Sequence, residues 1–334
     1  NILDTESGNM HEIKGKVIIN ATGVFADEII KLDNVESKSL IRPSQGIHLV
    51  LDQTFLKSKD AIMIPHTDDG RVLFAIPWYD KVIVGTTDTP LDSHSLEPRA
   101  LKSEVDFILE TAGKYLTRQP GRSDVLSVFA GLRPLAATNG SNAKTKEISR
   151  SHKVIVSDSG LVSVIGGKWT TYRKMAEDTL DKVIKRKVLP EKECVTMNLR
   201  IHGYSISDQP ANTLSIYGSD GQDLKELMAE KSEWSDTLSS ETNIMTGQVI
   251  WAVRKEMART VEDVLARRMR VLFIDARLAI SLAPKVADIM MKELRQDENW
   301  KENQIRSFSD LAKGYLLEDI TSVVASEIVI SKDN

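Results

Sequence analysis

A short apolar strand that ends in glycine and leads into a helix occupies residues 163–173, and it carries the residue types that most suggest chemistry. The glycine and polar positions of this run are Gly166, Gly167, Lys168, Thr170 and Thr171. The first backbone N–H groups of a helix have no partner inside it and attract anionic or electron-rich groups. With a cation and two hydroxyls beside them, they predict a binding site for such a group. The alternative is a tight strand-to-helix turn with a solvated lysine, because glycine pairs mark many turns.

Three further segments place glycine or a polar group at the end of an apolar strand, namely Ile18-Ile-Asn-Ala-Thr-Gly23, Gly85-Thr-Thr-Asp88 and Phe129-Ala-Gly-Leu-Arg-Pro134. In the last of them, Pro134 restricts the backbone of Arg133, so that its guanidinium is held in place. A guanidinium suits a phosphate or an alkoxide-like oxygen, which it binds through two parallel N–H groups. The alternative role for Arg133 is a surface ion pair.

One histidine lies where a base would be useful. His48 alternates with apolar residues on the strand expected over residues 47–51. A neutral imidazole can accept a proton near neutral pH, which makes His48 a candidate general base. The alternative is a hydrogen-bonded core residue, the commoner role of a lone histidine on a strand.

Length and composition predict a globular protein of two domains. The chain has 334 residues and a formal net charge of -4, which gives no indication of nucleic-acid binding. The single cysteine, Cys194, excludes an internal disulfide and a multi-cysteine metal site and fits a reducing compartment, and we expect no metal. No apolar stretch approaches the roughly 20 residues needed to cross a bilayer, and no signal peptide opens the chain. We therefore expect a protein that does not span a membrane.

The hydrophobic pattern changes along the chain. Residues 1–195 alternate short strands with a few helices, residues 196–210 have the polar, proline-containing composition of a linker, and residues 211–334 are rich in helix formers. The run Thr260-Val-Glu-Asp263 predicts a capping box. Pro284 is expected to begin a new helix, because proline is tolerated in a first turn and not in an interior. Residues 2–3 and 10–13 are expected to pair as a hairpin.

A strand-rich domain with glycine at its strand ends suggests a nucleotide or flavin fold, yet the chain lacks the usual G-x-G-x-x-G loop. One explanation is that the domain binds no dinucleotide. The other is that the glycine-rich loop lies upstream of Asn1, so that this chain is a fragment.

Taken together, these segments and several others closely resemble the FAD-dependent glycerol-3-phosphate dehydrogenases, and specifically the carboxy-terminal portion of that family from about Lys16 onward. The segments that carry the resemblance are Asn20-Ala-Thr-Gly23, Arg42-Pro-Ser-Gln-Gly-Ile-His48, Ile76-Pro-Trp78, Gly85-Thr-Thr-Asp88, Ala130-Gly-Leu-Arg-Pro134, Ser149-Arg150 and Gly166-Gly-Lys-Trp-Thr-Thr-Tyr-Arg173. In the helical part, Ala252–Thr260 and Asp263–Arg270 are similar to the family's carboxy-terminal helical domain.

The resemblance implies a mixed α+β and α/β fold. Residues 1–195 would hold part of an amino-acid-oxidase-like FAD-binding domain and the antiparallel sheet of a substrate domain, and residues 211–334 an all-helical domain. It implies that FAD oxidises sn-glycerol 3-phosphate to dihydroxyacetone phosphate and that electrons pass to quinone. A cytoplasmic protein, peripheral on the cytoplasmic membrane, would fit this activity.

The resemblance also assigns site residues. The catalytic residues would be His48, Arg133 and Lys168. The substrate-binding residues would be Arg133, Arg150, Lys168, Trp78 and Thr87. The cofactor-binding residues would be Ala21, Thr22, Gly23, Gly131, Gly166, Gly167, Lys168, Thr170 and Thr171.

Two other hypotheses compete with a quinone-linked glycerol-3-phosphate dehydrogenase. The protein could be an oxidase that passes electrons to oxygen, or another amino-acid-oxidase-like flavoenzyme acting on amines, although the number of cations favours a phosphate. Alternatively, this chain alone is an inactive fragment that retains no FAD. Its partners would then be the missing amino-terminal part of the same protein and, through an exposed sheet edge, a second copy in a homodimer.

Overall fold

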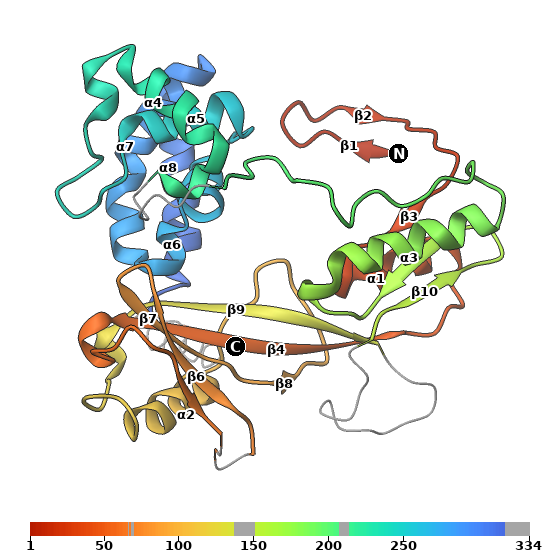
Figure 1. The fold of residues 1–334 in the computed structure, drawn as a ribbon, viewed down its shortest axis with the longest axis horizontal. Coiled ribbons are helices and arrows are strands. Elements are labelled where there is room, and N and C mark those ends of the chain that lie inside the picture. The colour runs from red at the N-terminus through yellow and green to blue at the C-terminus, as the bar shows by residue number, and fades with distance from the viewer. Residues whose placement is uncertain (66, 68–69, 137–150, 207–213, 318–334) are drawn as a thin grey trace, which may run out of the picture. The chain divides into compact units, whose positions relative to one another are not determined.

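The computed structural model describes residues 1–65, 67, 70–136, 151–206 and 214–317 (Figure 1). These residues form two compact units. The first unit comprises Asn1–Gly46, Asp88–Leu96 and Gly131–Leu199, and the second Ile47–Thr87, Glu97–Ala130 and Arg200–Asn334. Two long strands, β4 (Ile41–Asp52) and β9 (Val125–Ala136), each contribute residues to both units. The boundaries at residues 195 and 210 that the sequence suggests remain a prediction.

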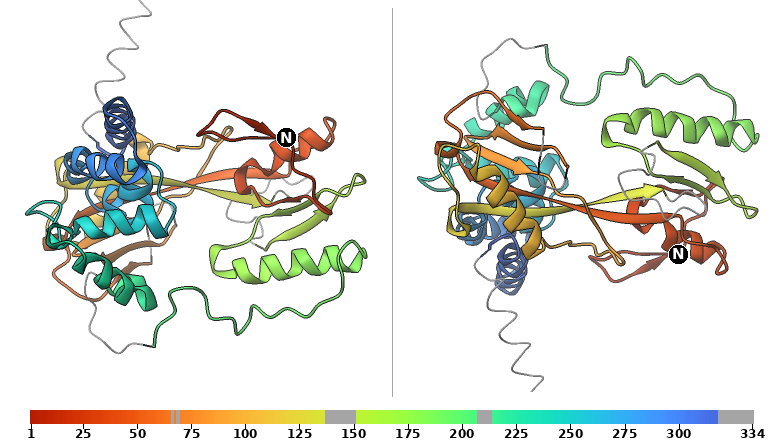
Figure 2. Two further views of the ribbon diagram at one scale, coloured as in Figure 1. Left: turned by 90° about the horizontal axis from the view of Figure 1, so that it is seen from above. Right: turned by 90° about the horizontal axis from the view of Figure 1, so that it is seen from below.

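The first unit is built on a three-stranded sheet in the order β10 (Lys153–Val156), β11 (Val162–Ile165) and β3 (Ile19–Asn20). Strand β3 runs parallel to β11, with Ile19 opposite Val162. Helices α1 (Ala26–Asp33) and α3 (Tyr172–Lys185) lie on opposite faces of this sheet (Figure 2). The short turns Gly23–Phe25 and Trp169–Thr171 precede these two helices.

The expected hairpin at the start of the chain is present, as β1 (Ile2–Leu3) pairs antiparallel with β2 (Met10–His11). The strand expected before the first glycine turn covers only Ile19–Asn20.

An antiparallel sheet dominates the other half of the strand-rich region. Its order is β5 (Ile62–Ile64), β6 (Leu73–Trp78), β7 (Lys81–Gly85), β4 and β8 (Thr89–Pro90), and β9 also pairs with β4. Tyr79 and Asp80 close the hairpin between β6 and β7 with φ values of 47° and 59°. Helix α2 (Lys102–Gly113) buries Val105 and Ile108 in the same apolar cluster as Leu49 and Val84, so the helix covers the sheet of the second unit. Short helical turns flank this region at Gln53–Phe55 and Arg122–Asp124.

The rest of the second unit is helical. Its elements are Ser215–Asp220, α4 (Gly221–Ala229), Ser232–Ser235, α5 (Thr246–Lys255), a π-helix over Asp263–Arg268, α6 (Val271–Ile274), α7 (Ala276–Leu294) and α8 (Glu298–Lys313). Helix α7 lies at the centre, because it packs against α5, α6 and α8. Its buried side chains, among them Leu282, Val286 and Met290, join one apolar core. Among the described residues, no helix is long and apolar enough to cross a membrane.

The predicted capping box is confirmed. The backbone N–H of Thr260 donates to Asp263 Oδ2 at 3.0 Å, and the N–H of Asp263 donates to Thr260 Oγ1 at 3.1 Å. The helix that follows is a π-helix rather than an α-helix.

The predicted break at Pro284 is wrong. Pro284 lies inside α7, which continues from Ala276 to Leu294 without interruption. A proline in a helix interior removes one backbone hydrogen bond, which costs about 3 kcal/mol. Ala283, Val286 and Ala287 around it are completely buried, and this burial is the local contribution that offsets the cost.

Candidate functional site

Two glycine turns of the first unit lie at the same edge of its sheet, because the parallel strands β3 and β11 both end there. Gly23 follows β3 with φ 62°, and Gly166 and Gly167 follow β11 with φ 70° and 89°. These left-handed values favour glycine over every other residue. The structure thus confirms that the glycines shape two adjacent strand-to-helix turns.

Asn20 joins the two turns. Its side-chain nitrogen donates to the Ala26 carbonyl at 3.0 Å and to Ser163 Oγ on β11 at 3.2 Å. Its side-chain oxygen accepts from the Thr22 hydroxyl at 2.7 Å and from the Thr22 backbone N–H at 3.3 Å. Asn20 is only 2% exposed, so these bonds replace water and fix the backbone of Ala21–Gly23.

Space also restricts the second turn to glycine. A Cβ at Gly166 would lie 3.0 Å from the Ser151 carbonyl oxygen and 3.1 Å from Ala136 Cβ, at the end of β9. A Cβ at Gly167 would lie 2.5 Å from Met175 Sδ. The turn is therefore packed between β9 and α3.

The residues after the second turn are open to solvent. Lys168 is exposed, and Thr171 donates its hydroxyl to the Lys168 carbonyl at 3.0 Å, which closes the turn before α3 begins at Tyr172. Thr170 is exposed as well. Trp169, 86% exposed, stacks on Tyr172 with ring centroids 5.8 Å apart. A cation, hydroxyls and aromatic faces are thus available to a ligand at this edge.

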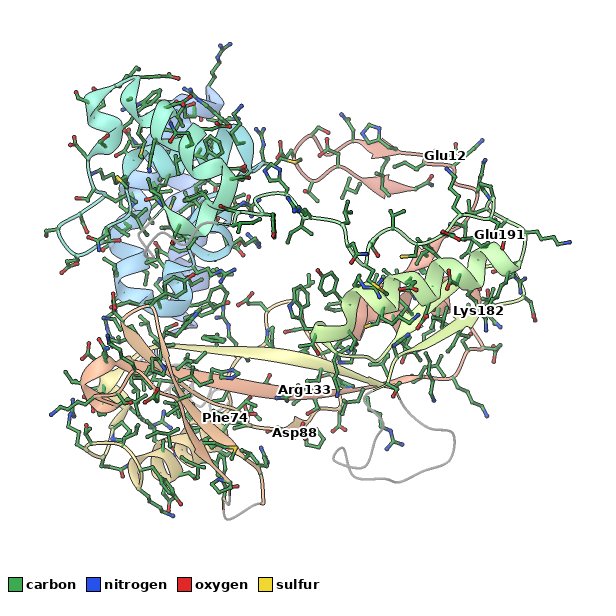
Figure 3. All side chains as sticks on the ribbon, viewed as in Figure 1. Glu12, Phe74, Asp88, Arg133, Lys182 and Glu191 are labelled. Atoms are coloured by element: carbon green, nitrogen blue, oxygen red, sulfur yellow. The ribbon has the colours of Figure 1, made fainter. Side chains whose placement is uncertain are left out.

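Arg133 of β9 is part of a polar cluster in the first unit. Its Nη1 lies 3.5 Å from Asp88 Oδ1, and Figure 3 labels both side chains. Ser44 of β4 donates its hydroxyl to the same carboxylate oxygen. The Arg133 side chain is 29% exposed, and its buried Nη1 makes an ion pair with Asp88 rather than a hydrogen bond.

Gly131 and Gly23 border unfilled space. A Cβ at either position would meet no atom of the described chain within 4 Å. Packing within the chain therefore does not explain glycine at Gly131, whereas a bound group close to the strand would. The glycine turns, the exposed Lys168 and this space fit the dinucleotide part of a flavin cofactor.

The second unit holds His48. Its ring stacks on Phe129 with centroids 5.4 Å apart, and it lies opposite Gly85 in the pairing of β4 with β7. A Cβ at Gly85 would lie 2.4 Å from His48 Cδ2, so glycine leaves room for the imidazole. The ring is therefore fixed by its neighbours.

Thr87 is 1% exposed and engaged in a buried network. Its hydroxyl accepts from the Ile47 N–H at 3.1 Å and donates to Glu104 Oε1 at 2.7 Å. The other oxygen of Glu104 accepts from the Leu101 N–H at 3.0 Å, before α2 begins. Thr87 thus ties α2 to β4.

Trp78 borders a cavity of about 530 Å³ in the second unit. Three aromatic rings, two aliphatic side chains and two arginines line this cavity, namely Trp78, Phe129, Phe273, Ile83, Ala266, Arg267 and Arg270. Arg267 is neutralised by Glu262 at 2.6 Å and Asp263 at 2.9 Å. The cavity is mainly aromatic in character.

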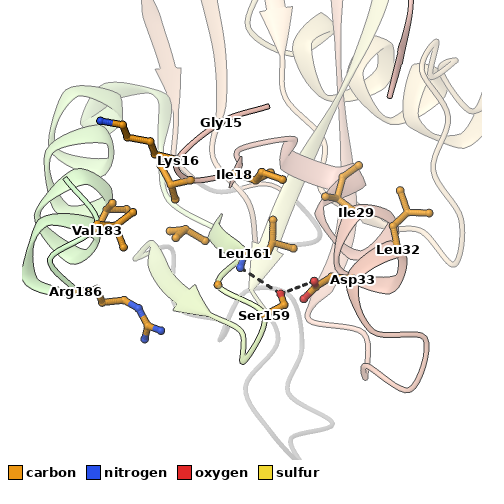
Figure 4. A pocket seen from close by; sticks show the side chains of 14 residues that line it. Gly15, Lys16, Ile18, Ile29, Leu32, Asp33, Ser159, Leu161, Val183 and Arg186 are labelled. Carbon is orange, nitrogen blue, oxygen red and sulfur yellow. Dashed lines mark hydrogen bonds between the residues drawn. The ribbon is translucent and has the colours of Figure 1, made fainter. Parts of the chain in front are cut away.

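A second cavity, of about 620 Å³, lies in the first unit (Figure 4). Ile18 and Leu161, which precede β3 and β11, line it together with Ile29 of α1 and Val183 of α3. It is therefore at the amino ends of the parallel strands, opposite the glycine turns. None of the predicted site residues borders it.

The described residues divide the predicted site between the two units. The turns, Lys168 and Arg133 belong to the first unit, and His48, Trp78 and Thr87 to the second. Arg150 lies outside the described residues. The roles assigned to all these residues stay predictions.

The sequence did not identify Asp88 and Asn20 as residues of the site. Both stand in motifs that carried the resemblance, Gly85–Asp88 and Asn20–Gly23, but only the partners revealed by the fold give them a function. His152 was also left unassigned. It packs on Gly167 and contacts Asp178 at 2.9 Å, and Lys174 and then His152 lower the pKa of that carboxyl.

Comparison with known families defines the class of protein. A family model described as FAD dependent oxidoreductase matches residues 2–173, and one described as the C-terminal domain of alpha-glycerophosphate oxidase matches residues 162–303. The chain belongs to the FAD-dependent oxidoreductase family. Its antiparallel sheet and its helical carboxy-terminal region agree with the expected fold class, which is thereby confirmed.

Individual relatives confirm the resemblance to the glycerol-3-phosphate dehydrogenases. The chain is 33% identical over 338 residues to the mitochondrial glycerol-3-phosphate dehydrogenase of Bos taurus, covering 93% of this chain and 46% of that protein. For the probable mitochondrial glycerol-3-phosphate dehydrogenase of Dictyostelium discoideum, identity is 33%, with 93% of this chain and 52% of that protein covered. The chain thus spans about half the length of these curated relatives.

One solved structure is similar throughout. The glycerol-3-phosphate dehydrogenase of Bacillus halodurans, solved in complex with FAD, superposes with a TM-score of 0.79 and 28% identity. The match covers 94% of this chain and 65% of that one.

Proposed function

We propose that the protein oxidises sn-glycerol 3-phosphate to dihydroxyacetone phosphate with FAD and passes the electrons to quinone. The observation that carries the proposal is the cationic, glycine-lined edge of the first unit. There the Gly166 turn packs against the end of β9, three residues after Arg133, and presents Lys168 to solvent. Family membership and the dehydrogenase relatives support it.

The backbone at this edge would hold the cofactor. The chemistry supplied by a bound flavin would be that of a hydride acceptor for the carbinol carbon. Gly23 and Gly131 border space for a close approach, and the N–H groups around the second turn favour electron-rich atoms. The full set would be Ala21, Thr22, Gly23, Gly131, Gly166, Gly167, Lys168, Thr170 and Thr171.

Arg133, Lys168 and Arg150 would bind the phosphate of the substrate, because a dianion requires several cations. His48 would accept the proton of the substrate hydroxyl at a ring nitrogen, since Phe129 and Gly85 fix the orientation of its ring. Trp78 would contribute a wall of the substrate pocket, and Thr87 would support that wall from within. Lys168 would also stabilise negative charge that develops in the reaction.

We also propose a cytoplasmic location and a homodimer. Because a quinone acceptor is dissolved in the lipid, the protein would lie peripherally on the membrane. The proposed division is a partial FAD-binding and substrate region over residues 1–195, a linker, and a helical domain over residues 211–334.

The test uses the protein expressed from its complete gene. We expect a yellow preparation whose flavin absorbance bleaches when glycerol 3-phosphate is added without oxygen. Colour should return faster with a soluble quinone than with oxygen, whereas the reverse order would indicate an oxidase. Bleaching by an amine instead of glycerol 3-phosphate would contradict the proposal, as would a colourless protein that does not bind added FAD.

The competing reading for the isolated chain has its own test. Residues 1–334 expressed alone should be colourless if this chain does not retain FAD. Flavin absorbance at near-stoichiometric occupancy would exclude the inactive-fragment reading.

A further inference from the structure

Asp88 occupies a position that the proposed chemistry does not use. It ends the motif Gly85–Asp88 and immediately precedes β8, and its carboxylate contacts two other strands. Ser44 of β4 donates to Asp88 Oδ1, and Arg133 Nη1 of β9 lies 3.5 Å from the same oxygen. Because β4 pairs with both β8 and β9, these three side chains form a row across neighbouring strands.

Burial distinguishes this row from an ordinary surface ion pair. The side chain of Asp88 is 13% exposed, and Ser44 is completely buried. By contrast, the exposed pair between Lys102 and Asp106 has side chains 73% and 44% exposed. Solvent weakens such exposed pairs until they contribute little, whereas a shielded carboxylate interacts strongly with its neighbour.

We propose that Asp88 is a positioning residue for the reaction. Its carboxylate, fixed by Ser44, holds the guanidinium of Arg133 in the orientation that receives an anionic group of the substrate. An arginine side chain has several rotatable bonds, and a fixed counter-charge restricts them before the ligand arrives. The inference rests on the proposed function, because it requires Arg133 to contact the substrate.

The register of β4 with β8 supplies the rigidity. Ser44 lies opposite Pro90 and Gln45 opposite Thr89, and the Leu91 N–H donates to the Pro43 carbonyl at 3.1 Å. The backbone that carries Asp88 is therefore attached to the strand that carries Ser44. Because the Asp88 carboxylate is carried by backbone that is paired with β4, it does not move with the Arg133 side chain. The ion pair therefore restricts the Arg133 side chain.

The experiment is a double-mutant cycle in the complete protein with its flavin. Asp88→Asn keeps the shape of the side chain and removes its charge. We expect kcat/KM for glycerol 3-phosphate to fall about 10- to 100-fold, the size of effect that misplaced reacting groups produce. In the background of Arg133→Ala, the same change should have almost no effect, because Asp88 acts through Arg133.

Chemical rescue by added guanidinium distinguishes a positioning role of Asp88 from a purely structural one. Guanidinium chloride at millimolar concentration should restore part of the activity of Arg133→Ala, and it should not restore activity to Asp88→Asn, Arg133→Ala. Binding of inorganic phosphate, measured by calorimetry, should weaken in Asp88→Asn by a similar factor to kcat/KM. Asp88→Glu should recover part of both.

Asp106→Asn is the matched control, because Asp106 also forms an ion pair with an arginine, Arg122, but on the surface of the second unit. It should leave kcat/KM unchanged. Ser44→Ala removes the hydroxyl that fixes the carboxylate, so it tests the inference if Asp88→Asn fails to fold, and it should lower kcat/KM.

The outcomes separate the two proposals. If Arg133→Ala turns over glycerol 3-phosphate normally, the role of Arg133 in the proposed function fails. If Arg133→Ala is impaired but Asp88→Asn or Ser44→Ala matches the unaltered protein, only the inference about Asp88 is overturned. Additive losses in the double variant would also overturn it.

Discussion

The glycine-lined edge of the first unit and the sheet of the second unit differ in what they offer a ligand. At the edge, Gly23, Gly166 and Gly167 adopt left-handed backbone, and Lys168 and Trp169 face solvent. In the second unit, Thr87 is buried and the His48 ring is fixed between neighbours. An edge of this kind presents backbone and charge to a large ligand, whereas the packed sheet fixes single side chains. Different substitutions should therefore damage each region in different ways.

The largest expected effect concerns the packed region. His48→Asn should lower kcat about 10²- to 10⁴-fold with little change in flavin content, because a general base contributes on that scale. Steady-state rates and the flavin absorbance of the complete protein measure both quantities.

His94→Asn is the control for this change. His94 also packs on an aromatic ring, Phe25, at 4.9 Å and pairs with Glu28 at 3.0 Å, but in the first unit. Its kcat should be unchanged. A loss at His94 as large as at His48 would contradict the assignment of the base.

At the edge, Gly167→Val and Gly131→Ala should separate stability from cofactor binding. Gly167→Val places a branched side chain against Met175 at φ 89° and should cost about 1–3 kcal/mol of stability, seen as a lower Tm. Gly131→Ala meets no atom within 4 Å, so the Tm of the flavin-free protein should be unchanged while flavin content falls. Full flavin occupancy in Gly131→Ala would show that the cofactor does not approach this strand.

Within the packed sheet, Thr87→Val should reduce the free energy of unfolding by about 1–3 kcal/mol. The change leaves Glu104 Oε1 without the hydroxyl that donates to it, and a buried acceptor that loses a donor is costly. Urea unfolding measures the effect. Thr170→Val, at an exposed position, should change stability much less, and equal losses at both positions would contradict the difference between the regions.

The smallest expected effect is a pH dependence in the helical part. Burial alone would raise the pKa of Asp263, but the N–H groups of Arg259 and Thr260 lower it below its ordinary value of 3.8. Because the folded-state pKa is the lower one, the stability that Asp263 contributes is complete above pH 3.8 and is lost as the pH falls through the folded-state value.

Urea unfolding at pH 5 and at pH 3 measures this contribution. Asp263→Asn should be less stable than the unaltered protein at pH 5, and the difference should shrink at pH 3. Asp223→Asn, which removes an exposed carboxylate on α4, is the control and should give a difference that varies less with pH. A deficit of Asp263→Asn that grows on acidification would contradict the predicted sign.

Local patterns predicted much of this structure. The apolar segment before Gly23 identified the strand that ends at Asn20, and Thr260-Val-Glu-Asp263 identified a capping box, because both signals lie within a few residues. Pro284 was misjudged because the burial that keeps α7 continuous comes from other helices. The pairing of Asp88 with Arg133 was equally invisible, since it depends on which strands flank β4.

The hydrogen bond from Asn20 to Ser163 has a topological consequence. It joins residues 143 positions apart, and all six strands of the antiparallel sheet lie in the chain between them. In topological terms, that sheet is an insertion into a loop whose two ends the amide side chain holds together. A single cut in the backbone of that sheet would therefore leave the two glycine turns joined through Asn20 and Ser163.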